Sequence, residues 1–510
     1  MDANRKRRTA VIDLGSNSFR LVVFTSVANA WWRRTDEIYE PVRIGAGMGD
    51  GGPLKPKRVE RALHTIEMYA HFLRASELEA DEVRAVATSA IREAANRDEF
   101  LARAREVAGF EIQVLSREEE AGYGYLAAVN STTLDHGAVL DLGGGSLQAV
   151  RVDRRLAQES ASWRLGTVRM TEAFLDDEPA TKKQLKALRA HVQEELAGAP
   201  WLGTSGERLV GLGGTARNLA AAAQHRAGLP SFGVQGFVLE REALAELTAD
   251  LAAMPAAERG SLRGVKPERG DVILAGAATI EAVMDAGGFE AMEVTEEGLR
   301  EGIFFEAYLA PADPPLFASV REASVRNLAT QHHGDLRHQR HVAALTLQLY
   351  DSLAAAGAHP GGAADRELVW AAALLHDVGY AVDYDDHHKH SRYLILNAGL
   401  PGWTQREVAL IALMARYHRK GNPSFGELAP LMVEGDEELL ARAAALLRLA
   451  EQLERSRDQL VREARVEVQD GTVRLELVAD GDVSVARWGA QRQRELFESA
   501  FGRRLEVDAP

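Results

Sequence analysis

Two short glycine-rich turns of the same form constrain the fold of this 510-residue chain more than any other feature. Asp13–Ser18 follows the apolar run Ala10–Ile12, and Asp141–Ser146 follows the apolar run Ala138–Leu140. Each pattern predicts a buried strand that ends at an aspartate and continues into a tight loop. Glycine lets the backbone N–H groups of such a loop approach an anion closely. The repetition therefore predicts a phosphate site built from two similar α/β halves.

A third turn, Gly211–Thr215, follows the apolar pair Leu209–Val210 and adds to the same prediction. Backbone N–H, hydroxyl and amide groups of the three turns are suitable donors to phosphate oxygens. The candidate phosphate-binding residues are Ser16, Asn17, Ser18, Gly143, Gly144, Gly145, Ser146, Gly214 and Thr215. The aspartates that precede two of the turns, Asp13 and Asp141, can hold a cation or a water beside the phosphate.

Three consecutive glutamates, Glu118–Glu120, follow a strand predicted at Ile112–Leu115. Acidic residues in the first turn of a helix complement the helix dipole, which accounts for one or two of them without any function. A carboxylate at this place, between the two halves, is also a suitable general base for activating water. The residues alone do not choose among the three.

Arg92 follows another strand end, in Thr88–Ala94. An arginine there is either a surface residue of a helix or a bidentate clamp on phosphate oxygens.

Composition excludes several classes of protein. The chain has no cysteine, which rules out disulfides, thiol catalysis and Cys-ligated zinc. A formal net charge of −15 disfavours nucleic-acid binding as the main role but leaves an anionic substrate open. No apolar run reaches the roughly 18–20 residues that span a bilayer, and no signal core follows the basic N-terminus. We expect a cytoplasmic protein with no membrane association.

The length predicts three or more domains. The first two, 1–125 and 126–309, have α/β patterns. Three prolines within Ala310–Pro315 indicate a linker. Residues 316–456 are predicted to form a helical domain, and 457–510 a small α+β domain with a hairpin at Asp470-Gly471 and a helix over 487–501.

His376-Asp377 lies on an apolar helix of the helical part, where burying either side chain requires a partner. Histidine and carboxylate together suit a transition metal. His341 lies one predicted helix earlier, and His418 follows. The alternative is a metal-free polar pair in the core.

These motifs, in this order, resemble the exopolyphosphatase/guanosine pentaphosphate phosphohydrolase family in its long form. The matching segments are Val11–Val22, Ala87–Ala94, Leu115–Ala121, Val139–Ser146, Leu165–Thr171, Gly211–Asn218 and, in the helical part, Leu374–Tyr380, His390–Ile395, Arg416–Arg419 and Leu446–Ala450. The resemblance implies two ribonuclease-H-like domains, similar to actin and the sugar kinases, with a cleft between them. An all-helical HD-like domain and a small α+β piece would follow.

The resemblance also implies an activity: hydrolytic release of terminal orthophosphate from inorganic polyphosphate with Mg²⁺ or Mn²⁺. The alternatives are hydrolysis of guanosine pentaphosphate and a weakly catalytic sensor of polyphosphate or alarmone. A homodimer is expected. By position in the motifs, Glu120 would be the base, Asp141 a metal-associated aspartate and Arg92 a phosphate contact. The implied metal ligands are Asp13, Asp141 and Glu120, with Gln148 as a weak one.

Two positions depart from the family's pattern. Gln148 stands where a glutamate is common, which keeps an acceptor oxygen but removes a negative charge. Glu451 stands at the last position of the HD-like site, where an aspartate is usual. The HD-like site implied in this way comprises His341, His376, Asp377 and Glu451.

Overall fold

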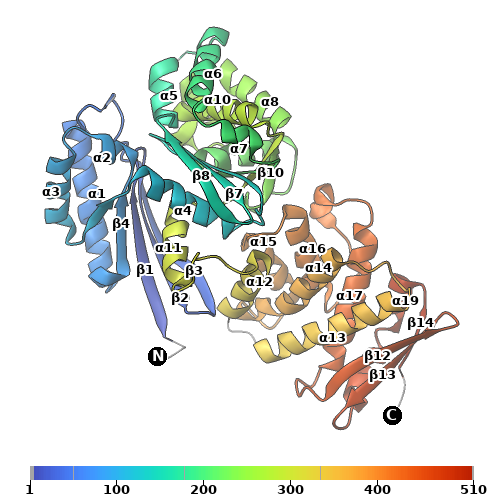
Figure 1. The fold of residues 1–510 in the computed structure, drawn as a ribbon. Coiled ribbons are helices and arrows are strands. Elements are labelled where there is room, and N and C mark those ends of the chain that lie inside the picture. Colours follow the sequence, from blue (N-terminus) through green and yellow to red (C-terminus); the bar gives the residue numbers. More distant parts are fainter. Residues whose placement is uncertain (1–4, 50, 177, 333–334, 508–510) are drawn as a thin grey trace. The chain divides into compact units, whose positions relative to one another are not determined.

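The computed structural model describes residues 5–49, 51–176, 178–332 and 335–507. The chain forms two compact units, Met1–Val320 and Arg321–Pro510, which are described separately (Figure 1). In the described residues, no helix is long and apolar enough to cross a membrane.

The first sheet of the first unit has five strands in the order β3-β2-β1-β4-β5. They are β1 (Lys6–Leu14), β2 (Phe19–Val27), β3 (Trp31–Glu40), β4 (Val83–Ala87) and β5 (Ile112–Val114). The first three form an antiparallel meander, and β4 and β5 continue from β1 in parallel. Val11 of β1, for example, pairs with Val22 of β2 and with Arg84 of β4.

The second sheet repeats this plan in the order β8-β7-β6-β9-β11, with β10 added at the edge. Its strands are β6 (Gly137–Leu142), β7 (Leu147–Asp153), β8 (Leu156–Trp163), β9 (Leu209–Leu212), β10 (Phe237–Glu240) and β11 (Ala291–Val294). A meander again continues into two parallel strands. The predicted pair of ribonuclease-H-like domains is confirmed.

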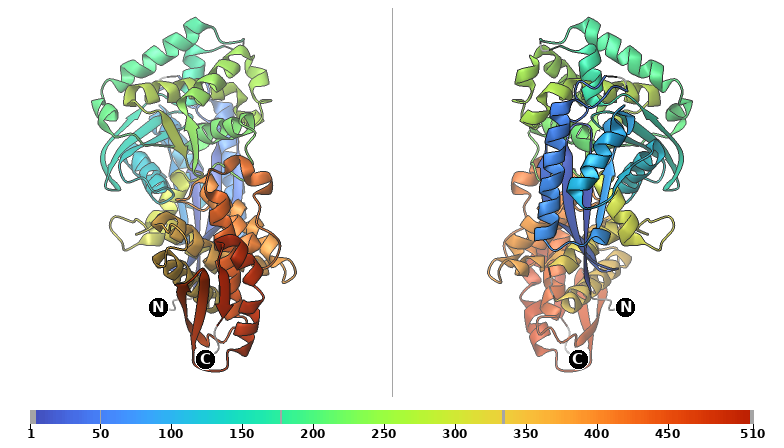
Figure 2. Two further views of the ribbon diagram at one scale, coloured as in Figure 1. Left: turned by 90° about the vertical axis from the view of Figure 1, so that its right-hand side faces the viewer. Right: turned by 90° about the vertical axis from the view of Figure 1, so that its left-hand side faces the viewer.

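Helices cover both faces of each sheet in the first unit (Figure 2). They are α1 (Pro56–Ala75), α2 (Ser89–Glu93), α3 (Arg97–Ala108), α4 (Arg117–Val129), α5 (Thr167–Phe174), α6 (Lys182–Leu196), α7 (Gly213–Arg226), α8 (Arg241–Ala253), α9 (Ala256–Arg259), α10 (Gly270–Gly287) and α11 (Leu299–Leu309). Short 3₁₀ turns lie at η1 (Ala80–Glu82), η2 (Pro200–Thr204) and η3 (Pro267–Arg269).

Strand alternation decides where the first aspartate points. Successive side chains of a strand face opposite sides of the sheet. Ile12 and Leu14 of β1 pack into the core that α1 and α3 close, whereas Val11 packs against α11. Asp13 lies two residues beyond Val11, so its carboxylate lies on the α11 side of the sheet.

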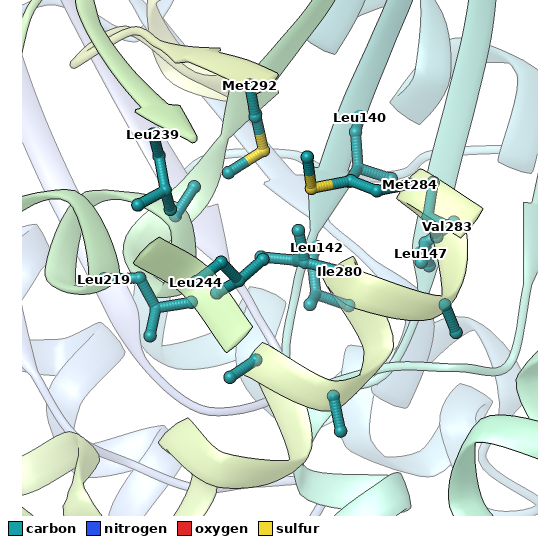
Figure 3. Close-up of a cluster of buried hydrophobic side chains, with 14 of the residues drawn as sticks. Leu140, Leu142, Leu147, Leu219, Leu239, Leu244, Ile280, Val283, Met284 and Met292 are labelled. Atoms are coloured by element: carbon teal, nitrogen blue, oxygen red, sulfur yellow. The ribbon is translucent and has the colours of Figure 1, made fainter. Parts of the chain in front are cut away.

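The second sheet places its aspartate in the same way. Leu140 and Leu142 of β6 pack into the large core with Ile280 and Met284 of α10, as Figure 3 shows. Val139 faces the other way, into the cluster that α4 closes. Asp141 therefore lies on the α4 side.

Helices α4 and α11 cross closely between the two sheets. A Cβ atom added to Gly302 of α11 would lie 2.0 Å from the carbonyl oxygen of Tyr123 in α4, so only glycine permits this approach. The crossing brings Glu120 of α4 and Arg300 of α11 into the layer that the two aspartates face. The positions of these side chains thus follow from strand alternation and one close helix crossing.

The second unit is mainly helical, as predicted. Its helices are α12 (Val320–Gln331), which begins at the unit boundary, α13 (Leu336–Ala355), α14 (Ala363–Leu375), α15 (His387–Asn397), α16 (Gln405–Tyr417), α17 (Asp436–Leu453), α18 (Ser484–Gln491) and α19 (Arg494–Phe501), with 3₁₀ turns η4 (Val378–Ala381) and η5 (Gly426–Leu431). Strands β12 (Val461–Gln469), β13 (Thr472–Ala479) and β14 (Arg504–Val507) form a small sheet. The hairpin at Asp470-Gly471 is confirmed, with positive φ at both residues. The helix predicted over 487–501 is instead two helices.

Candidate active site

A cavity of about 130 Å³ lies where the glycine-rich turns of the first unit meet α4 and α11. Most of the predicted site residues line it. They are Asp13, Ser16, Asn17, Ser18, Glu120, Asp141, Gly143, Gly144, Ser146, Gln148 and Gly214. The two halves of the first unit therefore contribute to one site.

The first two turns are tight β-hairpin loops with matching hydrogen bonds. The Gly15 N–H donates to the Ser18 carbonyl at 3.2 Å, and the Gly143 N–H donates to the Ser146 carbonyl at 3.0 Å. The start of α5 holds the second loop from behind: the Thr167 N–H donates to the Gly143 carbonyl at 3.0 Å. Carbonyl oxygens of the loop thus accept hydrogen bonds from backbone N–H groups of α5, and these bonds help to fix the path of the loop backbone.

Glu120 is held at the end of a hydrogen-bonded chain. Arg92 Nη1 donates to Glu120 Oε2 at 2.8 Å, and Ser146 Oγ donates to Glu120 Oε1 at 3.3 Å. The Gln148 amide in turn donates to Ser146 Oγ at 2.9 Å. Gln148 therefore acts here as a donor, a role that a carboxylate at this position cannot fill.

Burial raises the pKa values of two carboxylates in the cavity toward neutrality. Burial raises the pKa of Glu120 to about 6, and the neighbouring Arg92 only partly opposes this shift. Burial likewise raises the pKa of Asp141 to about 6, against the influence of Arg217. A carboxylate that is ionised at neutral pH and has a pKa this high is a better proton acceptor than a solvated one.

Four arginines that sequence reasoning missed also line the cavity: Arg20, Arg217, Arg269 and Arg300. Arg300 Nη1 donates to Asp13 Oδ2 at 3.0 Å. Burial and the neighbouring Arg300 lower the pKa of Arg217 to about 10. Because this value is still well above 7, Arg217 is charged at neutral pH. Arginines gathered in this way suit an anion with several oxygens. The sequence carried little signal for them, because they come from a strand, two helices and a 3₁₀ turn far apart in the chain.

The carboxylates of the cavity fit a hard divalent cation. Mg²⁺ prefers oxygen ligands and is commonly bound by one or two carboxylates together with substrate phosphates. Among the described residues we find no hydrogen bond to the Asp141 carboxylate, and one oxygen of Asp13 is free of Arg300. Asp141 and Asp13 are thus the residues that would hold such an ion.

Three predicted site residues do not line this cavity. Arg92 lies behind Glu120, where its guanidinium also donates to the Leu115 carbonyl at 2.9 Å, so the structure gives no support to its expected role as a phosphate clamp. Gly145 packs against Ser89 Oγ, 2.5 Å from where its Cβ would be, and Thr215 is buried against Gly276 of α10. Gly145 instead lines a larger cavity beside this one, and Thr215 packs against α10.

The second candidate site, in the second unit, has a different histidine from the one expected. His338 lies with His376 and Asp377, and these three residues could hold a metal ion; so could Asp377, His387 and His418. His341 lies outside the group, because its Nε2 is 2.8 Å from the Val461 carbonyl of β12. The expected Glu451 does belong, with its Oε2 3.0 Å from His338 Nε2.

Comparison with solved structures yields chains that are similar to somewhat more than half of this chain. A Ppx/GppA family member from Aquifex aeolicus is 29% identical over 59% of this chain and 97% of its own, with a TM-score of 0.51. An exopolyphosphatase-like protein is 27% identical over 58% of this chain and 96% of its own, with a TM-score of 0.53. An exopolyphosphatase from Cytophaga hutchinsonii, at 21% identity over 59% of this chain and 98% of its own, shares the fold with a TM-score of 0.55.

Family comparison covers both units. Residues 22–310 match the Ppx/GppA phosphatase family, and residues 320–487 match domain III of the Ppx/GppA phosphatases. The first match spans more than half of the chain and contains most of the residues around the cavity. The protein therefore belongs to the Ppx/GppA phosphatase family.

Proposed function

We propose that the chain is an exopolyphosphatase, which hydrolyses the terminal phosphoanhydride bond of inorganic polyphosphate. The observation that carries this proposal is the cavity of about 130 Å³ in which four arginines and three carboxylates meet two glycine-rich loops. Pockets for drug-sized ligands have volumes of roughly 300–1,000 Å³. A cavity this small and this polar suits a single phosphoryl group, with the rest of an anionic chain outside it.

The terminal phosphoryl group would be held by charge and by backbone donors. The loop N–H groups of Ser16, Asn17 and Gly144, which line the cavity, would donate to its oxygens, and Arg217 and Arg300 would offset its charge. A divalent ion held by Asp13 and Asp141 would supply further positive charge to the phosphoryl oxygens. Catalysis of phosphoryl transfer is mainly positioning and electrostatic stabilisation, which this arrangement can provide.

Glu120 would accept the proton of the attacking water. Its carboxylate lines the cavity and is oriented by Arg92 and Ser146. The water oxygen would attack the terminal phosphorus as its proton passes to Glu120. The bond to the bridging oxygen would break, releasing orthophosphate and a chain one unit shorter.

The substrate class is tested by comparing kcat/KM for orthophosphate release from long-chain polyphosphate and from guanosine pentaphosphate. The proposal predicts the higher value for polyphosphate. Release from guanosine pentaphosphate alone would contradict it and leave the phosphatase assignment intact.

Hydrolysis of guanosine pentaphosphate is the second candidate because a larger cavity adjoins the first. This cavity, of about 600 Å³, shares Ser16 and Gly144 with the phosphate cavity and includes the apolar side chains of Met48, Leu165 and Val168. It is large enough for a nucleoside. If it takes one, Ala173→Trp, an exposed position on its wall, should reduce activity on guanosine pentaphosphate and spare activity on polyphosphate. An equal effect on both substrates would argue against a nucleoside pocket.

The pKa values in the cavity predict the acid side of the pH profile. Glu120 must be ionised to accept a proton, and Asp141 must be ionised to hold a cation; both have pKa values raised to about 6. Activity should therefore be constant above neutrality and fall as the pH drops through about 6, with a limiting slope of about two on a logarithmic scale. A profile of kcat/KM against pH checks this. Full activity down to pH 4.5, the ordinary pKa of a glutamate, would contradict it.

Gln148→Glu tests whether the glutamine at position 148 limits catalysis at this site. The substitution removes the donor to Ser146 and places a negative charge close to Glu120, which should raise the Glu120 pKa further. We expect the fall of activity at low pH to move to higher pH by up to about one unit. The added carboxylate should also lower the Mg²⁺ concentration needed for half-maximal rate. A large rise in kcat at neutral pH would instead indicate that Gln148 disables the site and that the natural role is binding. Gln113→Glu, an exposed change of the same kind, is the control.

A further inference from the structure

One buried carboxylate links the two halves of the first unit beside the phosphate cavity. Glu93 is the last residue of α2, in the half built on the first sheet, and its side chain is only 11% exposed. Two arginines of the other half reach it: Arg164, which follows β8, and Arg169 of α5. These three residues do not line the phosphate cavity, so the chemistry proposed there gives them no role.

Both arginines donate to the same oxygen of Glu93. Arg164 Nε and Nη2 lie 2.9 and 2.6 Å from Glu93 Oε2, and Arg169 Nη2 lies 2.8 Å from it. Arg117 Nη2 of α4 is 3.8 Å from the other oxygen, Oε1. Hydrogen bonds between ionised groups are roughly twice as strong as neutral ones. One carboxylate thus gathers three guanidinium groups, two of them from the opposite half.

Arg169 carries this link on to the second glycine-rich loop. While its Nη2 bonds to Glu93, its Nε donates to the Gly145 carbonyl at 3.2 Å. The next residue of the loop is Ser146, whose hydroxyl donates to Glu120 at 3.3 Å. The loop is therefore tied through one guanidinium to a carboxylate of the other half.

The other end of the link is the helix that holds Arg92. Arg92 directly precedes Glu93 in α2 and donates to Glu120 Oε2 at 2.8 Å. The two side chains that orient Glu120, Arg92 and Ser146, thus come from opposite halves of the unit. Their relative position depends on what joins α2 to the loop, and Glu93 makes that connection.

A second ion pair between the halves is more exposed. Arg43 Nη1 donates to Asp271 Oδ2 at 2.7 Å, and the two side chains are 35% and 40% exposed. Exposed ion pairs contribute little, and salt screens them. Glu93 and Arg169, at 11% and 17%, are much better shielded. We therefore expect the buried pair to hold the halves more firmly than the exposed one.

We propose that Glu93 is a positioning residue for phosphoryl transfer: through Arg169 it fixes the second glycine-rich loop against the helix that orients Glu120. The inference rests on the proposed roles of the loop and of Glu120. Glu93→Gln keeps the size of the side chain but removes its charge. Since a displacement of about 1 Å at a catalytic site can cost about 100-fold in rate, kcat for polyphosphate should fall by about 10–100-fold. KM should change by less than about threefold, because the cavity arginines remain.

The kinetic test compares Glu93→Gln with Glu99→Gln, the same change at an exposed position of α3. The control should keep the wild-type kcat. Arg169→Gln should reproduce the loss, and the double variant with Glu93→Gln should lose no more than the worse single variant, because the two residues act as one link. A double variant whose loss is the product of the single losses would overturn the proposal. So would the wild-type kcat in a folded Glu93→Gln.

A second measurement does not require activity. The chain has no cysteine, so Glu67→Cys in α1 and Lys186→Cys in α6, both exposed, introduce one pair of sites for spin labels, one on each half (Figure 1). Pulsed electron paramagnetic resonance should give a narrow distance distribution in the labelled chain and in its Glu99→Gln variant. Adding Glu93→Gln should broaden it.

The two measurements separate this inference from the proposed function. An unchanged distance distribution after Glu93→Gln overturns the inference, because the link would then hold nothing in place. If the wild type releases orthophosphate from neither polyphosphate nor guanosine pentaphosphate, the proposed function fails and the label distances alone decide whether Glu93 joins the halves. If circular dichroism shows that Glu93→Gln is unfolded, Arg169→Gln takes its place in both measurements.

Discussion

Glu120→Gln should lower kcat for orthophosphate release from polyphosphate by about 10²–10⁴-fold, the usual contribution of general base catalysis. The amide keeps the size of the side chain and an acceptor oxygen but cannot take a proton from water at neutral pH. Because the arginines and loops remain, KM for polyphosphate should change little. The measurement is steady-state release of orthophosphate, with binding of polyphosphate followed separately.

Glu118→Gln provides the control for this prediction. Glu118 lies in the same turn of α4 but is exposed, whereas Glu120 is buried and lines the cavity. The control should keep wild-type activity. Equal losses in both variants would show a general effect of charge at the helix start, and an active Glu120→Gln would place the base elsewhere.

Gly166→Ala should be the second severe change, although residue 166 does not line the phosphate cavity. A Cβ atom there would lie 2.2 Å from the carbonyl carbon of Gly145 and 2.4 Å from the backbone nitrogen of Ser146. Both are backbone atoms, so the loop itself must move. A displacement of about 1 Å at a catalytic site can cost about 100-fold in rate, and we expect a loss of at least that size in kcat/KM.

The control for the loop prediction is Gly122→Ala, also a change from glycine to alanine. Gly122 lies two residues from Glu120 in α4, and nothing lies within 4 Å of its added Cβ. Alanine in a helix interior is favoured over glycine by about 0.5–1 kcal/mol, so this variant should be active and slightly more stable. Circular dichroism would confirm that Gly166→Ala is folded. Wild-type activity in a folded Gly166→Ala would show that the loop position does not limit the reaction.

Much of the fold could be predicted from local patterns. The hairpin at Asp470-Gly471 agrees with the sequence expectation, because turn residues between alternating apolar positions specify it locally. Strands β3 and β8, with few buried residues, gave no comparable signal. The expected single helix over 487–501 breaks between α18 and α19, which the apolar pattern did not reveal.

The candidate site was predictable where it lies on the repeated turns and unpredictable where it depends on packing. The turns themselves pointed to Asp13 and Asp141. The residues alone did not choose among the three glutamates, although the family resemblance implied Glu120; its burial depends on the crossing of α4 and α11. Arg217 and Arg269 converge from distant segments and carry no local mark of function. In the second unit, sequence order favoured His341, but its Nε2 contacts β12 and His338 takes the place in the cluster.

The most direct test of the central claim is the fate of solvent oxygen during hydrolysis of polyphosphate in ¹⁸O-labelled water. If water activated at Glu120 attacks the terminal phosphorus, each released orthophosphate carries one solvent oxygen, and the shortened chain carries none. Orthophosphate should be released one unit at a time. Label at the end of the shortened chain, release of oligophosphate fragments, or no release at all would contradict the account.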